Sequence, residues 1–158
     1  MRSLFKLEKY WRNNIMSNLS LFLKGNKKEK EVVEYAPTKS LVDEEGNPLK
    51  FKWKSISVKE DEALRDECTV EVQVTGKPNM YRPKFNANKY AAKMIAESCV
   101  EPDLYNAELQ NSYGVMTPED LIREMVDDPG EYQDLTVFIQ DLNGFNKSKA
   151  DLVEEAKN

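Results

Sequence analysis

Residues 49–54 alternate strictly between apolar and polar side chains. Leu49, Phe51 and Trp53 occupy every second position, and a lysine follows each of them. Successive side chains of a β-strand point to opposite faces, so this pattern predicts a strand that buries one face against a core. The lysines form a row on the other face. Two interpretations of that row stay open: an anion-binding stripe, or charges that solvate the strand and discourage edge-to-edge pairing.

A second alternating stretch covers residues 69–75, where polar residues separate three valines. We expect a strand here whose valines face inward, followed by a turn at residues 76–79. Residues 80–85 predict a returning strand. Pro83 should confine that strand to a sheet edge, because proline has no N–H to donate to a ladder. The alternating stretches together indicate a small antiparallel sheet in the N-terminal half of the chain.

The spacing of apolar residues changes from two to about 3.6 beyond residue 86, which predicts helices. We expect a first helix that Pro102 ends, and a short second helix over residues 107–113. The apolar face of the first helix consists of Tyr90, Ala91, Met94, Ile95, Ser98 and Cys99. The fold class is therefore α+β, with the small antiparallel sheet in the N-terminal half and a helical C-terminal half.

Capping patterns mark three further helix starts. The Ser-x-x-Glu pattern at residues 57–60 is a capping box, which predicts a helix to about residue 68. The Thr-Pro-Glu-Asp run at 117–120 combines a capping hydroxyl, a proline at the first helical position and acids at the positive end of the helix dipole. The Asp-Pro-Gly-Glu run at 128–131 starts another helix, which Asn-Gly at 143–144 should end.

The start of the chain supports two interpretations. Trp11-Arg12 can be encoded as TGG-AGG, a purine-rich ribosome-binding element just upstream of Met16, so Met16 is a candidate for the true start. Alternatively, the first residues form a short basic amphipathic helix. We expect four segments: residues 1–15 as a non-native upstream extension, 16–48 as an N-terminal helix and tether, 49–145 as a single α+β domain with a helical C-terminal half, and 146–158 as a charged C-terminal tail.

Charge and hydropathy limit the partners of the chain. Its 158 residues include 23 Lys plus Arg and 28 Asp plus Glu, for a formal net charge of -5. That field repels phosphate backbones, so we expect no nucleic-acid partner. No apolar run approaches the ~20 residues of a membrane helix, and no secretory signal is evident, so we expect no membrane contact and a place inside the cell. Cys68 and Cys99 have no CxxC neighbour and should be reduced, buried thiols.

The residue arrangements that most often carry catalysis are missing from the sequence. It contains no histidine, no glycine-rich phosphate loop and no G-x-S-x-G run. The acidic residues of the helix expected at 57–68 lack the convergent spacing of metal ligands and suit a solvated face. We therefore predict a non-enzymatic protein with no catalytic residue, no cofactor and no metal, which acts by binding other proteins.

The order and spacing of several short runs resemble those of the tail assembly chaperones of Gram-positive phages and defective prophages. The resemblance covers about residues 16–157. The runs that carry it are MSNLSLFLK at 16–24, TKSLVD at 38–43, RDECT at 65–69, YRPK at 81–84, ES at 97–98, PDLY at 102–105, ELQNSYGV at 108–115, PGEY at 129–132 and LNGF at 142–145.

What this resemblance implies is a helper made in the host bacterial cytoplasm during virion assembly, from a gene between those of the tail tube and the tape measure. Such a protein binds the tape measure protein, assists polymerisation of the tail tube protein and is absent from the mature virion; some relatives also have a longer, frameshifted form. Self-association is a further expectation. The alternative is a structural tail completion or connector protein that the virion retains.

The mechanism that we expect is reversible cover, in which apolar helix faces of the tape measure occupy apolar grooves of the chaperone. Acidic outer surfaces would keep the assembly soluble, and tube subunits would then displace the chaperone. The flanks of the chain are the segments least needed to build the core, so we take them as the candidate contacts with the partner. These partner-binding residues are Leu19, Leu21, Phe22, Leu23, Phe145, Leu152 and Val153.

Overall fold

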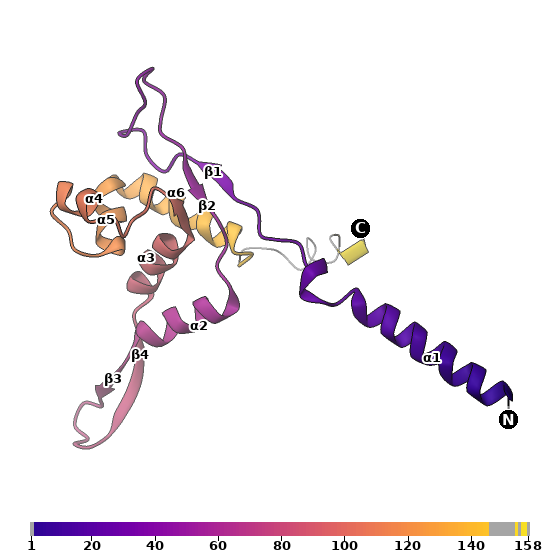
Figure 1. Cartoon of the computed structure of the whole chain (residues 1–158). Coiled ribbons are helices and arrows are strands. Elements are labelled where there is room, and N and C mark those ends of the chain that lie inside the picture. The colour runs from indigo at the N-terminus through magenta and orange to yellow at the C-terminus, as the bar shows by residue number, and fades with distance from the viewer. Residues whose placement is uncertain (1, 146–153, 155, 158) are drawn as a thin grey trace. The chain divides into compact units, whose positions relative to one another are not determined.

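The computed structural model describes residues 2–145, 154, 156 and 157, and the chain divides into two units, Met1–Lys30 and Glu31–Asn158 (Figure 1). The first unit contains α1 (Arg2–Ser20) and a short 3-10 helix, η1 (Lys24–Asn26). The second contains β1 (Val33–Tyr35), β2 (Phe51–Trp53), α2 (Val58–Glu67), β3 (Thr69–Gln73), β4 (Tyr81–Phe85), α3 (Ala87–Ser98), β5 (Cys99–Glu101), α4 (Ala107–Ser112), α5 (Pro118–Met125) and α6 (Pro129–Leu142).

A three-stranded antiparallel sheet has the order β1-β2-β5. The alternation around β2 is confirmed for Phe51 and Trp53, which are buried, whereas Leu49 precedes the strand and is 39% exposed. The Trp53 indole N–H donates to the Tyr35 carbonyl at 3.1 Å, so the buried ring keeps a hydrogen-bond partner. Phe138 of α6 packs on this face, with its ring centroid 6.3 Å from that of Trp53.

Strand β5 was not predicted. The pattern favoured a helix through Cys99 as far as Pro102, but α3 ends at Ser98 and the chain becomes extended. The Lys54 N–H donates to the Ser98 carbonyl at 2.8 Å, which joins this segment to the end of β2. A residue before proline prefers an extended backbone, and a strand of three residues is too short to show a period of its own.

Strands β3 and β4 form a separate antiparallel hairpin that extends away from the helices of the same unit (Figure 1). The turn and the returning strand agree with the sequence pattern. The prediction that the valines face inward is wrong for Val70, which is 54% exposed, whereas Val72 and Val74 are partly buried. Every residue of β4 is exposed. The reason is that the hairpin projects beyond the helical body, so Val70 has no packed layer to cover it.

The C-terminal half is helical, and α3 packs against both α5 and α6. Three predicted caps are present: Ser57 forms the full capping box with Glu60, Thr117 accepts from the Asp120 N–H, and Asp128 caps α6. The α+β fold class is confirmed. The core cluster consists of Phe51, Trp53, Leu64, Met94, Ile95, Ala96, Leu104, Leu121, Ile122, Met125, Val126, Leu135 and Ile139.

Hydrogen bonds from side chains at the ends of α6 connect the helical body to its loops. The Asn143 side chain, at the end of α6, accepts from the Ile56 N–H at 2.9 Å and donates to the Ser98 hydroxyl at 3.3 Å. At the other end of α6, Glu131 accepts from the Thr38 hydroxyl at 3.0 Å and from the Lys39 N–H at 2.8 Å. Both ends of α6 are therefore held by segments distant in sequence.

Candidate protein-binding groove

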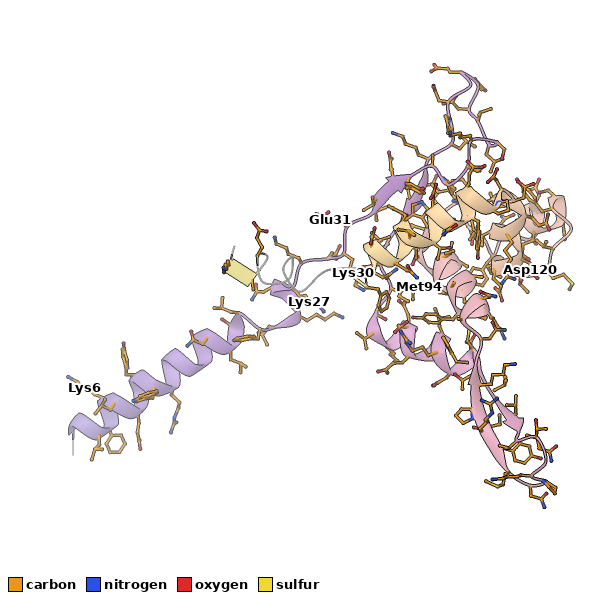
Figure 2. All side chains as sticks on the ribbon, turned by 180° about the vertical axis from the view of Figure 1, so that it is seen from behind. Lys6, Lys27, Lys30, Glu31, Met94 and Asp120 are labelled. Carbon is orange, nitrogen blue, oxygen red and sulfur yellow. The ribbon has the colours of Figure 1, made fainter. Side chains whose placement is uncertain are left out.

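A groove of about 280 Å³ lies along the junction of α3 and α6, with α2 at one end. Figure 2 labels Met94, a residue of α3 that lines this groove. The lining residues are Arg65, Ala87, Tyr90, Ala91, Met94, Ile95, Thr136, Ile139, Gln140 and Phe145.

Small residues on α3 explain why the two helices leave a groove. Ala87 and Ala91 lie one turn apart and both line it, so α3 presents methyl groups where longer side chains would fill the space. Met94 and Ile139, which are 3% and 1% exposed, close its floor. The Thr136 hydroxyl donates to the Tyr132 carbonyl at 2.9 Å, so its polar group is satisfied within α6. The resulting floor is apolar.

A polar cluster borders the α2 end of the groove. The Tyr90 hydroxyl donates to Asp61, whose other carboxylate oxygen accepts from the Arg65 Nε–H at 3.0 Å. The Arg65 guanidinium lies 4.8 Å from the centroid of the Tyr90 ring, as in a cation–π contact. Burial, together with the hydrogen bond to Asp61, raises the pKa of Tyr90 to about 12. At neutral pH this end of the groove therefore presents a neutral phenol beside a paired cation.

The groove continues into a shallower hollow between α3, α5 and α6, and the two share Ala91, Thr136 and Gln140. Helix α3 has 12 residues, so its length is about 18 Å at 1.5 Å per residue. A volume of 280 Å³ is at the lower limit for a small-molecule pocket. A groove with an apolar floor between two helices suits the i, i+3, i+4 anchors of a partner helix.

One predicted contact residue belongs to this groove. Phe145 lines it, is 50% exposed, and is held there by its N–H, which donates to the Gln140 carbonyl at 3.0 Å. Leu152 and Val153 lie outside the described residues. The flank prediction as a whole stays a prediction.

The other predicted contacts belong to the first unit. Leu19 lies in the last turn of α1, which ends at Ser20, and Leu21, Phe22 and Leu23 follow the helix. The four side chains are between 57% and 84% exposed, with Phe22 the most exposed. They form a short apolar surface with no apolar cover within the described residues of that unit.

The sequence pattern placed Tyr90 and Met94 on the apolar face of the first helix and did not reveal the groove. Met94 is buried, yet it lines the floor of the groove, because its neighbours on α3 are small. The useful signal is the pair of alanines at 87 and 91 on the apolar face of α3.

The lysine row gives little support for anion binding. Lys52 forms an ion pair with Glu101 of β5, with 2.8 Å between Nζ and the carboxylate oxygen. A hydrogen bond from Lys52 to Glu101 raises the pKa of the lysine. At least one of the three lysines therefore forms an ion pair between two strands of the sheet.

Residues 2–145, 154, 156 and 157 contain no cluster of histidine, cysteine or acidic side chains that is arranged to hold a metal ion. None of the helices described within those residues has the length and apolar character that crossing a membrane requires. Cys68 and Cys99 are both unbridged; Cys68 is buried and Cys99 partly so.

Comparison with known proteins shows the family to which the chain belongs. The family model described as "Phage XkdN-like tail assembly chaperone protein, TAC" matches residues 19–157. Two relatives come from Bacillus subtilis (strain 168). Protein YqbN is 30% identical over 146 residues, which are 92% of this chain and 97% of YqbN. The phage-like element PBSX protein XkdN is 28% identical over 147 residues, which are 93% of this chain and 98% of XkdN. The crystal structure of YqbN matches with a TM-score of 0.66 and 25% identity, over 80% of this chain and 96% of that chain.

Proposed function

Because the chain belongs to the phage XkdN-like tail assembly chaperone family, we propose that it binds the tape measure protein and assists polymerisation of the tail tube. Its role lies in phage tail assembly. The finer steps rest on the groove between α3 and α6, which is the observation that carries the proposal. In the proposed cycle the chaperone acts in the host cytoplasm by contact alone and leaves before the virion is complete.

The chemistry of the groove favours a helical occupant. Its floor is apolar, so an amphipathic helix of the tape measure would bury apolar side chains there at about 25 cal/mol per Å² of surface removed from water. The net charge of -5 gives separate copies a mutual repulsion that opposes aggregation of the complex. Tail tube subunits that contact the same helix would then displace the chaperone by competition.

A charge placed in the groove tests this proposal. Ala91→Glu should reduce capture of co-expressed tape measure protein about tenfold or more, because a carboxylate would be buried against the apolar side chains of the partner. Asn111→Glu on α4 is the matched control, since it adds the same charge at an exposed position outside the groove lining. Equal capture by the two variants, both folded by circular dichroism, would remove the groove from the proposal.

The flanks are a second proposed contact region, tested by deletion. A chain without residues 19–23 and a chain cut before Phe145 should each retain less tape measure protein in the same pull-down. Undiminished capture after both deletions would exclude the flanks. Because Phe145 also lines the groove, Phe145→Ala separates its contribution from that of the tail beyond it.

The retained connector is the competing proposal, and mass spectrometry of purified particles distinguishes the two. A chaperone should be missing or present in traces, whereas a connector would be stoichiometric with other tail proteins. The tail tube protein and self-association complete the proposed set of partners. The Met16 start also stays a proposal, which the N-terminal mass of the native protein tests.

A further inference from the structure

The β3–β4 hairpin has two outer edges, and its register decides which backbone groups each edge presents. Glu71 lies opposite Pro83, and the pairing continues without a bulge along both strands. The next pair toward the turn, Val74 and Met80, is hydrogen-bonded, because the Val74 N–H donates to the Met80 carbonyl at 2.8 Å. Antiparallel pairs alternate between hydrogen-bonded and non-hydrogen-bonded, so the Glu71–Pro83 pair is non-hydrogen-bonded. Its backbone N–H and C=O groups therefore point away from the hairpin.

The two edges differ in their capacity to accept another strand. The outward residues of β4 are Tyr81, Pro83 and Phe85, and the central one has no N–H. On β3 the outward positions include Glu71 and Gln73, whose N–H groups have no hydrogen-bond partner among the described residues. Proline is a common means of blocking an edge. The β4 edge is thus blocked at its centre, and the β3 edge is open.

One face of the hairpin beside this open edge is apolar along β3. Val70 and Val72 point to the same face, and their partners across the hairpin are Lys84 and Arg82. Val70 is 54% exposed. A strand added beside β3 would cover the two valines, with the long basic side chains one strand further away. A two-stranded hairpin is only marginally stable in water, so a third strand would also stabilise it.

Charge indicates what kind of strand would bind. Lys77, Arg82 and Lys84 against Glu71 give residues 69–85 a net charge of +2, whereas the whole chain carries -5. A second copy of this chain is disfavoured at this edge. Full antiparallel overlap of two β3 strands would place Glu71 opposite its own copy and bring two basic hairpins together.

We propose that the outer edge of β3 binds an extended, acidic segment of a partner protein as a third strand. Backbone hydrogen bonds to Glu71 and Gln73 supply the affinity, and Arg82 and Lys84 select acidic side chains on the valine face. This surface is separate from the α3–α6 groove, and its role does not depend on the tape measure being the groove's partner.

Hydrogen exchange of the full chain tests the edge directly. The probe is a synthetic peptide of roughly nine residues that alternates glutamate and valine, long enough to span β3. Amide exchange at Glu71 and Gln73 should slow about tenfold or more when the peptide is bound, because both N–H groups gain acceptors. Tyr81 and Phe85, on the opposite edge, are internal controls and should not change. Protection at those two residues in place of Glu71 and Gln73 would overturn the assignment.

Two substitutions at one position separate the edge from its charge. Glu71→Pro removes an outward N–H that the hairpin's own ladder does not use, and should weaken peptide binding about tenfold. Glu71→Gln removes the same charge, keeps the N–H, and should bind the acidic peptide at least as tightly as the natural chain. Equal affinities of the two variants would overturn the proposal, and the exchange measurement above needs neither variant.

Two further outcomes would also contradict it. A peptide with lysine in place of glutamate should bind several-fold more weakly, so equal binding would refute selection by charge. Sedimentation equilibrium should show no dimer that Glu71→Pro abolishes. Such a dimer would assign the β3 edge to a second copy of the chain.

Discussion

Strand β2 lies between β1 and β5, with Phe138 of α6 packed on its face, whereas β3 has one neighbouring strand and no covering layer. Both come from strictly alternating sequence. Trp53 in β2 is fully buried, yet Val70 in β3 is 54% exposed. Alternation therefore specifies a strand and its two faces, while burial depends on whether a second layer is present to cover one of them.

The sheet around β2 and the β3–β4 hairpin also differ in the roles for which their surfaces are suited. The aromatic side chains of β2 belong to the same core as the helices. Strand β2 is paired with another strand on each side. The hairpin keeps apolar side chains and an open edge in solvent. Exposed surface of this type is where an added strand or helix gains most from binding.

The sharpest test of this contrast is removal of an aromatic side chain from each region. Trp53→Ala should lower the free energy of unfolding by about 3–5 kcal/mol, because it leaves a large cavity in the core and frees the Tyr35 carbonyl. Tyr81→Ala, at a residue 62% exposed on the hairpin, should cost less than about 1 kcal/mol. Urea unfolding followed by circular dichroism measures both, and similar losses would show that the hairpin belongs to the core.

A smaller change in the free energy of unfolding should appear at alkaline pH, from a thiol in the sheet next to Trp53. Cys99 of β5 pairs with Trp53, and burial raises the pKa of its thiol from 9.0 to about 12. The folded state favours the neutral thiol, so this stabilisation is complete below pH 9 and is lost as the pH rises toward 12. The pKa values of Tyr90 and Tyr105 are raised from 10.0 to about 12, so their contribution is lost between pH 10 and 12.

Replacement of Cys99 separates these contributions. In Cys99→Ala, the decline of unfolding free energy between pH 9 and 10 should be shallower than in the natural chain, because Cys68, whose pKa burial also raises, is then the remaining thiol that titrates there. Urea midpoints at half-unit steps from pH 8 to 11 provide the measurement. A slope between pH 9 and 10 unchanged from that of the natural chain would mean that the Cys99 thiol is not buried as described.

Local signals predicted most of the helical half, because each start has a side chain that satisfies free N–H groups within one turn. The hydroxyl of Thr117 and the carboxylate of Asp128 are examples. Strand β5 was missed, since three residues before Pro102 carry no period and become a strand only by pairing with β2. Of the candidate contacts, Phe145 lines the groove. The groove itself depends on how two helices pack around Ala87 and Ala91, which no short pattern encodes.

The smallest expected effect comes from one substitution made in both regions. Val70→Thr on the hairpin should change the unfolding free energy by less than about 0.5 kcal/mol, because threonine keeps the β-branched shape and its hydroxyl remains in water. The same change at Val126, which is 1% exposed, should cost about 1–3 kcal/mol, because it buries a hydroxyl among apolar side chains. Losses of equal size would mean that Val70 is covered in solution, and the valine face of β3 would then not be free to receive a partner.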